Sequence, residues 1–173
     1  VICGFGRTGK WFGAQHFGVT PDLMTFAKGV TSGYLPLSGV IVSRRVCDTL
    51  EEPDFVLRTG YTYSGHPTSC AAGIANLELM ERESLVDRAN HVGEQIRKGL
   101  ESLQSDGLIE SWRGTGAVYA VEIEQDPMQI RNEIRSKGVI LRPLNTGLAI
   151  CPPLTISDKE IGQVIDAMAE VLK

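Results

Sequence analysis

The first part of the chain carries short apolar runs separated by turn residues. Val1–Cys3, Leu23–Ala27 and Leu37–Val42 are short, mainly apolar and bounded by Gly, Pro or Ser. Such runs are typical of strands buried on both faces, so they predict a mostly parallel sheet. A helix is expected from Pro67 to about Glu81, because Pro is favoured in a first helical turn and the small residues that follow allow close contact with the sheet.

A long amphipathic helix is predicted next. Ser84 and Asp87 have the spacing of a capping box at its start. Apolar residues then recur at intervals of three and four and form one stripe: Leu85, Ala89, Val92, Ile96, Leu100 and Leu103. We expect this helix to link two domains.

After Gly107 the pattern predicts a small α+β unit. Leu108–Trp112 and Ala117–Ile123 alternate in the manner of antiparallel strands. Val139–Arg142 and Leu148–Ile150 predict two shorter strands in the same unit.

Two helices complete this unit. Asp126-Pro127 opens the first helix and Gly138 closes it. Ser157 and Glu160 form a capping box for the last helix. Its apolar face consists of Ile161, Val164, Ile165, Met168 and Leu172.

Composition agrees with a globular protein and excludes some function classes. The chain has 42% hydrophobic residues and a net charge of -4, with no basic stripe that would favour nucleic acid. No apolar run approaches the roughly 20 residues that span a bilayer, and the start lacks a signal-peptide pattern, so a cytoplasmic location is expected.

The cysteines give no sign of a metal or disulfide site. Cys3, Cys47, Cys70 and Cys151 are far apart in sequence and form no C-x-x-C pair. We expect reduced and mostly buried thiols, and no metal ligands.

Lys28 is the leading candidate for chemistry. It follows the apolar run Leu23–Ala27, and Gly29, Ser32 and Gly33 allow the backbone to turn closely around it. A lysine amine becomes a nucleophile when partial burial beside a cationic group lowers its pKa. Spacing alone leaves open the alternative that Lys28 is an ordinary solvated lysine.

One glycine-rich motif resembles a nucleotide site. Gly4-Phe5-Gly6-Arg7-Thr8-Gly9 satisfies G-x-G-x-x-G and nearly satisfies a P-loop. Trp11 stands where a P-loop needs Ser or Thr, and Asp22 comes too early for ribose recognition. We therefore expect these glycines to shape a loop near a cofactor instead.

Several motifs occur together in the order of one known family. They are Val1–Gly9, Phe17–Asp22, Lys28-Gly29, Gly33–Pro36, Tyr61–Pro67 and Cys151–Leu154. Over essentially its whole length the chain resembles class III pyridoxal-phosphate aminotransferases, especially the branch that uses omega-amino acids and pyruvate.

The resemblance implies an α/β fold, the type I fold of pyridoxal-phosphate-dependent transferases. Residues 1–83 would be part of the large cofactor-binding domain, 84–106 a linking helix, and 107–173 the small C-terminal α+β domain. The start at Val1, in a strand pattern without Met, favours a fragment. In the family, the acid that pairs with the pyridine nitrogen, the phosphate loop and the ring-stacking aromatic residue come from earlier sequence.

The resemblance also implies a set of site residues. Lys28 would carry pyridoxal 5'-phosphate as a Schiff base and act as the catalytic base. Tyr61 and Val1 would contact the cofactor, with Val1 against the pyridine ring. Thr62 would reach the cofactor phosphate of the neighbouring subunit, in a homodimer with shared active sites. Arg142 would bind the substrate carboxylate.

Alternatives remain for two of these residues. The Thr62 hydroxyl could bond within its own turn. Arg142 could form a surface ion pair.

The activity implied is transfer of an amino group from an omega-amino acid or primary amine to a keto acid such as pyruvate. We expect little or no activity from this chain alone. The interval from Glu124 to Met128 also resembles the diaminopelargonate synthase branch of biotin synthesis. An aminomutase, racemase or decarboxylase could use the same lysine, and a relative that has lost the cofactor would be no enzyme at all.

Overall fold

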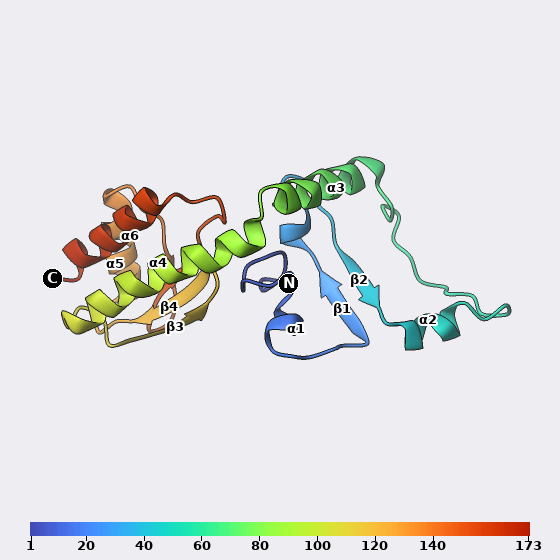
Figure 1. Cartoon of the computed structure of the whole chain (residues 1–173), viewed down its shortest axis with the longest axis horizontal. Coiled ribbons are helices and arrows are strands. Elements are labelled where there is room, and N and C mark those ends of the chain that lie inside the picture. Colours follow the sequence, from blue (N-terminus) through green and yellow to red (C-terminus); the bar gives the residue numbers. More distant parts are fainter. The chain divides into compact units, whose positions relative to one another are not determined.

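A computed structural model describes all residues from 1 to 173, and the chain divides into two compact units. The first contains Val1–Phe5 and Lys10–Ser84, and the second contains Gly6–Gly9 and Leu85–Lys173 (Figure 1). Each unit is described by itself. None of the helices is both long and apolar enough to cross a membrane.

The first unit contains a two-stranded sheet. Strands β1 (Leu23–Phe26) and β2 (Gly39–Val42) pair antiparallel, with Leu23 opposite Val42. The prediction of parallel, buried strands is wrong for this pair. The connecting segment turns back on itself, with Gly33 at a φ of 79°, so the second strand returns beside the first.

The first residues form turns and no strand. Val1–Cys3 was expected to be a strand, but residues 2–8 form a series of turns. Phe5 and Gly6 have φ angles of 52° and 87°, in the left-handed region that a strand cannot adopt. These angles belong to the series of turns that already begins at Ile2.

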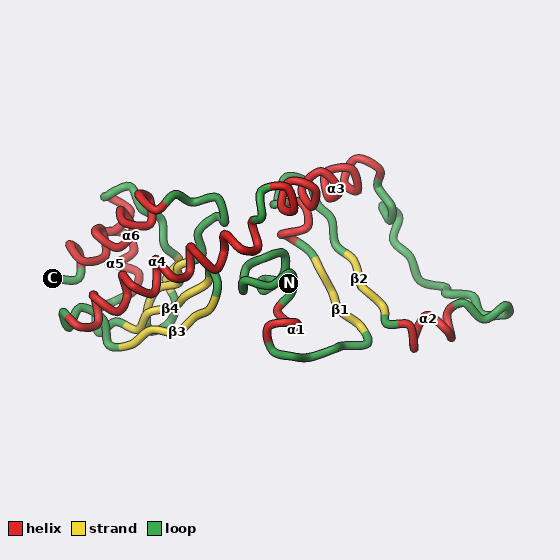
Figure 2. Tube along the Cα trace, in the orientation of Figure 1, coloured by secondary structure: helices red, strands yellow, loops and turns green.

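The helices of the first unit are short except for the last. They are α1 (Gly13–His16), η1 (Lys28–Thr31), α2 (Arg44–Leu50) and α3 (Pro67–Arg82). The predicted helix starting at Pro67 is confirmed, with Pro67 in its first turn. The His66 ring accepts a hydrogen bond from the backbone N–H of Ser69 and so caps this helix. A long loop joins α2 to α3 (Figure 2).

The second unit is organised around α4 (Leu85–Ser105). All residues of the predicted apolar stripe are buried, and all but Leu85 belong to the hydrophobic core of this unit, which confirms the helix and its orientation. The capping box predicted at Ser84 is wrong. Ser84 has a φ of 50°, whereas an N-cap residue is extended, because the chain turns tightly between α3 and α4.

A four-stranded antiparallel sheet lies beside this helix. Its order is β3 (Ser111–Thr115), β4 (Val118–Glu122), β6 (Gly147–Ile150) and β5 (Arg142–Pro143). In Figure 1 the helices of this unit lie on one face of the sheet. The predicted antiparallel character is confirmed, but β3 and β5 begin three residues later than expected.

The first residue of each of these two predicted strands is held by the helix before it. The N–H of Leu108 bonds to the carbonyl of Leu103, and the N–H of Val139 bonds to that of Ile134. The glycine before each of them is left-handed, with φ angles of 72° and 87°. These bonds complete the ends of the preceding helices, so the residues are not free to pair in the sheet.

Two further helices cover the core of this unit. The Asp126 side chain accepts a hydrogen bond from the N–H of Gln129 at 2.7 Å and caps α5 (Pro127–Ser136). The capping box of Ser157 with Glu160 begins α6 (Asp158–Val171). Both predicted helix starts are confirmed.

The four cysteines are free thiols. Cys3 and Cys151 are exposed, whereas Cys47 and Cys70 are half-buried. The expectation of mostly buried thiols is therefore wrong. Cys3 lies in the initial series of turns and Cys151 follows the end of β6, and neither place is enclosed.

Backbones approach closely where α4 crosses the turn between β3 and β4. A Cβ atom on Gly93 would lie 2.0 Å from the carbonyl oxygen of Gly116. This oxygen belongs to the backbone and cannot move aside as a flexible side chain could. The helix can pass the turn at this distance only because position 93 has no side chain.

We expect Gly93→Ala to lower the free energy of unfolding by about 1–3 kcal/mol, because the added methyl group overpacks this contact. This is opposite to the usual helix preference for Ala over Gly, which is worth about 1 kcal/mol. Gly162→Ala in α6 is the matched control, because a Cβ there meets no atom within 4 Å. Denaturation of the two variants should give shifts of opposite sign, and stabilisation by both would contradict the contact.

Candidate functional site

Lys28 stands on an unusual piece of backbone at the end of β1. Its φ angle is 54°, in the left-handed region, and Ala27 before it is fully extended. For a residue other than glycine this conformation costs on the order of 1–3 kcal/mol and persists only where the surroundings hold it. The change of direction projects the Lys28 side chain into solvent, where it is exposed.

Contacts from α3 hold the turn that follows Lys28. The Asn76 side-chain amide donates hydrogen bonds to the carbonyl of Gly29 at 2.9 Å and to that of Val30 at 3.2 Å. The Thr31 hydroxyl donates to the carbonyl of Leu35 at 2.6 Å. Val30 and Thr31 are themselves buried. The side chains of Asn76 and Thr31 therefore hold this turn in place.

A second contact limits the turn from the other side. A Cβ atom on Gly29 would lie 2.9 Å from the Cβ of Phe5. Any larger residue after Lys28 would therefore push against this ring. Lys28 thus has a strained backbone angle, and the position after it has room only for glycine.

The amine of Lys28 has no acidic partner in the first unit. The ion pairs of this unit lie elsewhere, on Asp22, Arg44 and Arg82. An exposed primary amine without an ion pair is available for reaction with a carbonyl group once it is deprotonated. The partial burial that the sequence suggested is not present around Lys28 within this chain.

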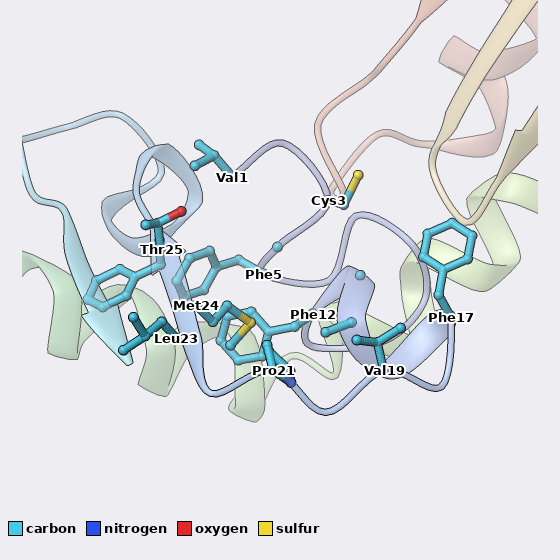
Figure 3. A pocket seen from close by; sticks show the side chains of 14 residues that line it. Val1, Cys3, Phe5, Phe12, Phe17, Val19, Pro21, Leu23, Met24 and Thr25 are labelled. Atoms are coloured by element: carbon cyan, nitrogen blue, oxygen red, sulfur yellow. The ribbon is translucent and has the colours of Figure 1, made fainter. Parts of the chain in front are cut away.

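An apolar cavity of about 460 Å³ opens beside β1. Figure 3 shows Val1, Phe5, Phe12 and Thr25 among the side chains that line it. The Phe5 ring meets the Phe12 ring edge to face, with centroids 5.4 Å apart. Val1 is thus brought to the same cavity as the last residues of β1, which lead directly to Lys28.

Thr62 lies in a separate turn of the first unit. Ser64 closes this turn, because its hydroxyl accepts from the N–H of Tyr61 at 3.2 Å and its own N–H donates to the Tyr61 carbonyl at 3.0 Å. The alternative that Thr62 bonds within its own turn is therefore not observed. Thr62 is exposed, and Tyr61 is 83% exposed.

The turn that contains Thr62 borders a second cavity of about 400 Å³. Tyr61, Ser64 and His66 line one side of it, and Pro36–Ser38 line another. The latter residues follow the turn that begins at Lys28. This cavity is not lined by Val1, so the expected cofactor contacts are distributed over two places in the first unit.

Arg142 belongs to the second unit. It is the first residue of β5, pairs with Ala149 of β6, and is exposed. The ion pairs of this unit use Arg88, Arg97 and Arg113 among the arginines. The alternative of a surface ion pair is thus not observed, and the guanidinium group is free to bind a carboxylate.

Arg7 and Asn76 are the structurally important polar residues that sequence patterns did not identify as such. Arg7 is half-buried in the second unit, and burial lowers the pKa of its guanidinium group from a very high ordinary value. Asn76 was detectable as a single amide within a stretch of small and apolar residues. Arg7 was hidden within a glycine motif whose spacing suggested a nucleotide site.

Comparison with known proteins identifies relatives along the whole chain. The sequence model of the family described as Aminotransferase class-III matches residues 1–172. The chain is 39% identical to diaminobutyrate–2-oxoglutarate transaminase of Halomonas elongata, and 34% identical to putrescine–pyruvate aminotransferase of Pseudomonas aeruginosa. Each alignment covers 95% of this chain and 39% of the relative, so the chain spans about two fifths of their length.

A solved structure agrees with this result. The (S)-enantioselective omega-transaminase of Thermomicrobium roseum is similar with a TM-score of 0.92 and 38% identity. The alignment covers 99% of this chain and 41% of that one. The α/β architecture described above is therefore part of the fold of class III transaminases, a family of pyridoxal-phosphate-dependent enzymes.

We expect Asn76→Leu to loosen the turn after Lys28 and to cost about 1–3 kcal/mol, because two backbone carbonyls lose their donor. Asn76→Asp should be more harmful at neutral pH, because a carboxylate would face those carbonyls. Faster hydrogen exchange in a peptide covering residues 27–35 would report the change. Asn132→Leu, at an exposed position, is the control. Equal exchange in all variants would show that Asn76 does not hold the turn.

Proposed function

Because the chain belongs to the class III aminotransferase family, we propose that the protein containing it is a pyridoxal-phosphate-dependent aminotransferase. It would move an amino group from an omega-amino acid or primary amine to a keto acid such as pyruvate. The observation that carries the proposal is the free amine of Lys28, held on a left-handed turn at the end of a strand. Nothing in a purely structural role requires a lysine at that strained position.

The named substrates of the relatives support the class of amine. Diaminobutyrate and putrescine, in the names of the two relatives, both carry a terminal primary amine. The acceptors in those names are 2-oxoglutarate and pyruvate, which are both keto acids. A donor with a terminal amine and a keto-acid acceptor is thus the substrate pair that we propose.

The residues of the first unit fit the cofactor. Lys28 would hold it through its amine, and Val1 would pack against the ring from the apolar cavity. When bound, pyridoxal phosphate supplies an electron sink that stabilises negative charge at the substrate carbon. Once the donor amine has displaced it from the cofactor, the freed amine of Lys28 would take up the proton from that carbon and deliver it to C4' of the cofactor, as a general base and then a general acid.

Thr62 and Tyr61 would serve the phosphate end of the cofactor. The Thr62 hydroxyl has no partner within its turn and can donate to a phosphate oxygen. We propose that it serves the cofactor of a second subunit, so that the protein is a homodimer with shared active sites. Four free thiols favour a cytoplasmic location for it.

Arg142 would bind the substrate carboxylate through a two-pronged hydrogen bond. We propose that residues 1–83 belong to the cofactor-binding domain, 84–106 to a linking helix and 107–173 to the small domain. The division of the chain between Ser84 and Leu85 supports this assignment, with the exception of Gly6–Gly9, which lie in the second unit. Arg142 would then act from the small domain.

The full-length protein should be yellow, and borohydride should fix the mass of the cofactor on the peptide that contains Lys28. Lys28→Ala should abolish both the adduct and transamination, while Lys28→Arg keeps the charge and should also be inactive, because a guanidinium group is not a nucleophile at neutral pH. A colourless wild-type protein without an adduct would instead indicate a relative that has lost the cofactor.

Substrate assays on the same protein separate the remaining alternatives. Beta-alanine or a primary amine with pyruvate should give turnover. Turnover only with adenosylmethionine and the oxononanoate acceptor would replace our substrate proposal with diaminopelargonate synthesis.

We expect Thr62→Val to weaken cofactor binding by about tenfold or more, since a hydrogen bond to a charged group is lost. Thr62→Ser keeps the hydroxyl and should remain close to wild type. Equilibrium dialysis followed by absorbance of the bound cofactor would measure both. If Val and Ser bind equally well, Thr62 does not contact the phosphate.

A further inference from the structure

The segment Gly6–Gly9 is built into the second unit, and Arg7 is its main anchor. One guanidinium nitrogen, Nη1, donates hydrogen bonds to the carbonyls of Ala117 at 2.9 Å and Pro152 at 2.5 Å. The carbonyl of Arg7 in turn accepts from the N–H of Ala117 at 2.9 Å. Arg7 therefore connects the turn between β3 and β4 with the exit of β6.

Close contacts on all sides fix this segment in place. A Cβ atom on Gly116 would lie 2.5 Å from the carbonyl oxygen of Arg7, so the two backbones touch. Thr8 is 4% exposed, and the Asn90 side chain donates to the carbonyl of Gly9 at 3.3 Å. The backbone that carries Arg7 thus has little freedom to shift.

The contact with Pro152 holds the chain where the hydrogen bonds of the sheet have ended. Strand β6 ends at Ile150, and Pro152 and Pro153 have no N–H with which to continue the ladder. Arg7 captures the carbonyl of Pro152 and so restrains the chain just beyond the strand.

The position of β6 determines where Arg142 lies. Strand β5 is two residues long and pairs only with β6, where Arg142 lies opposite Ala149. Partial burial raises the pKa of the Cys151 thiol, and the positive charges of Arg7 and Arg142 both oppose that rise.

We propose that Arg7 is a positioning residue for Arg142. By restraining the exit of β6, it holds the short strand β5 and the direction of the Arg142 guanidinium group. Arg7 makes no contact with a substrate in this scheme. The inference rests on the proposed function, because it concerns the substrate carboxylate that Arg142 would bind.

The experiment uses the full-length holoenzyme. Arg7→Met removes the donors and keeps the aliphatic stem, and should raise the KM for pyruvate about tenfold, because a small displacement of a binding group is costly. The half-reaction with a primary amine that has no carboxylate should stay within about twofold of wild type. Arg7→Lys keeps a charge and three donors on a shorter stem, and should restore part of the affinity.

A double-mutant cycle tests whether Arg7 acts through Arg142. In an Arg142→Met background, Arg7→Met should change the KM for pyruvate by less than about twofold. Arg88→Met is the matched control, because Arg88 also donates to a backbone carbonyl of this unit, that of Ile156. It should leave the KM for pyruvate unchanged even if the protein becomes less stable.

Binding of propionate, measured by calorimetry, gives a readout without turnover. Arg7→Met should weaken it as much as it raises the KM. An unchanged propionate affinity, an equal loss in both half-reactions, or additive effects with Arg142→Met would each overturn the positioning role. A wild-type protein without transamination would overturn the proposed function, and propionate binding would still decide the role of Arg7.

Discussion

Holding a lysine in the left-handed region requires that other parts of the fold compensate for the strain, and the first unit is arranged to do so. The amide of Asn76 binds two consecutive carbonyls after Lys28, and Phe5 leaves room only for glycine at position 29. Helix α3 is thereby tied to the end of β1. An amine on a flexible loop would sample many directions, whereas that of Lys28 projects from a turn with few alternative conformations.

In the second unit, the main constraint is the close approach of backbones from different elements. Gly93 and Gly116 lack side chains where helix, turn and the Gly6–Gly9 segment meet, and Arg7 bonds to carbonyls on two sides. The apolar stripe of α4 supplies the burial that keeps these elements together. A polar bridge at the edge of this core, from Arg7 to the carbonyl of Pro152, restrains the chain just after β6, the strand with which β5 pairs.

Each of the two units contributes exposed polar or charged side chains to the proposed reaction. Lys28 and Thr62 are exposed polar groups without partners in the first unit, and Arg142 is an exposed cation without an ion pair in the second. Groups of this type are poor contributors to stability but well suited to bind a cofactor or substrate. The chain spans about two fifths of the length of these relatives.

Local sequence determined much of this protein, because caps and apolar periodicity act within a few residues. The stripe of α4, the capping box at Ser157 and the helix start at Pro67 were all predictable in this way. Tertiary structure decided the rest. The antiparallel pairing of β1 with β2, the late starts of β3 and β5, and the partners of Asn76 and Arg7 depend on residues distant in sequence or on competition for one N–H group. No local pattern contains that information, because each of these outcomes requires knowing which backbone groups are already occupied.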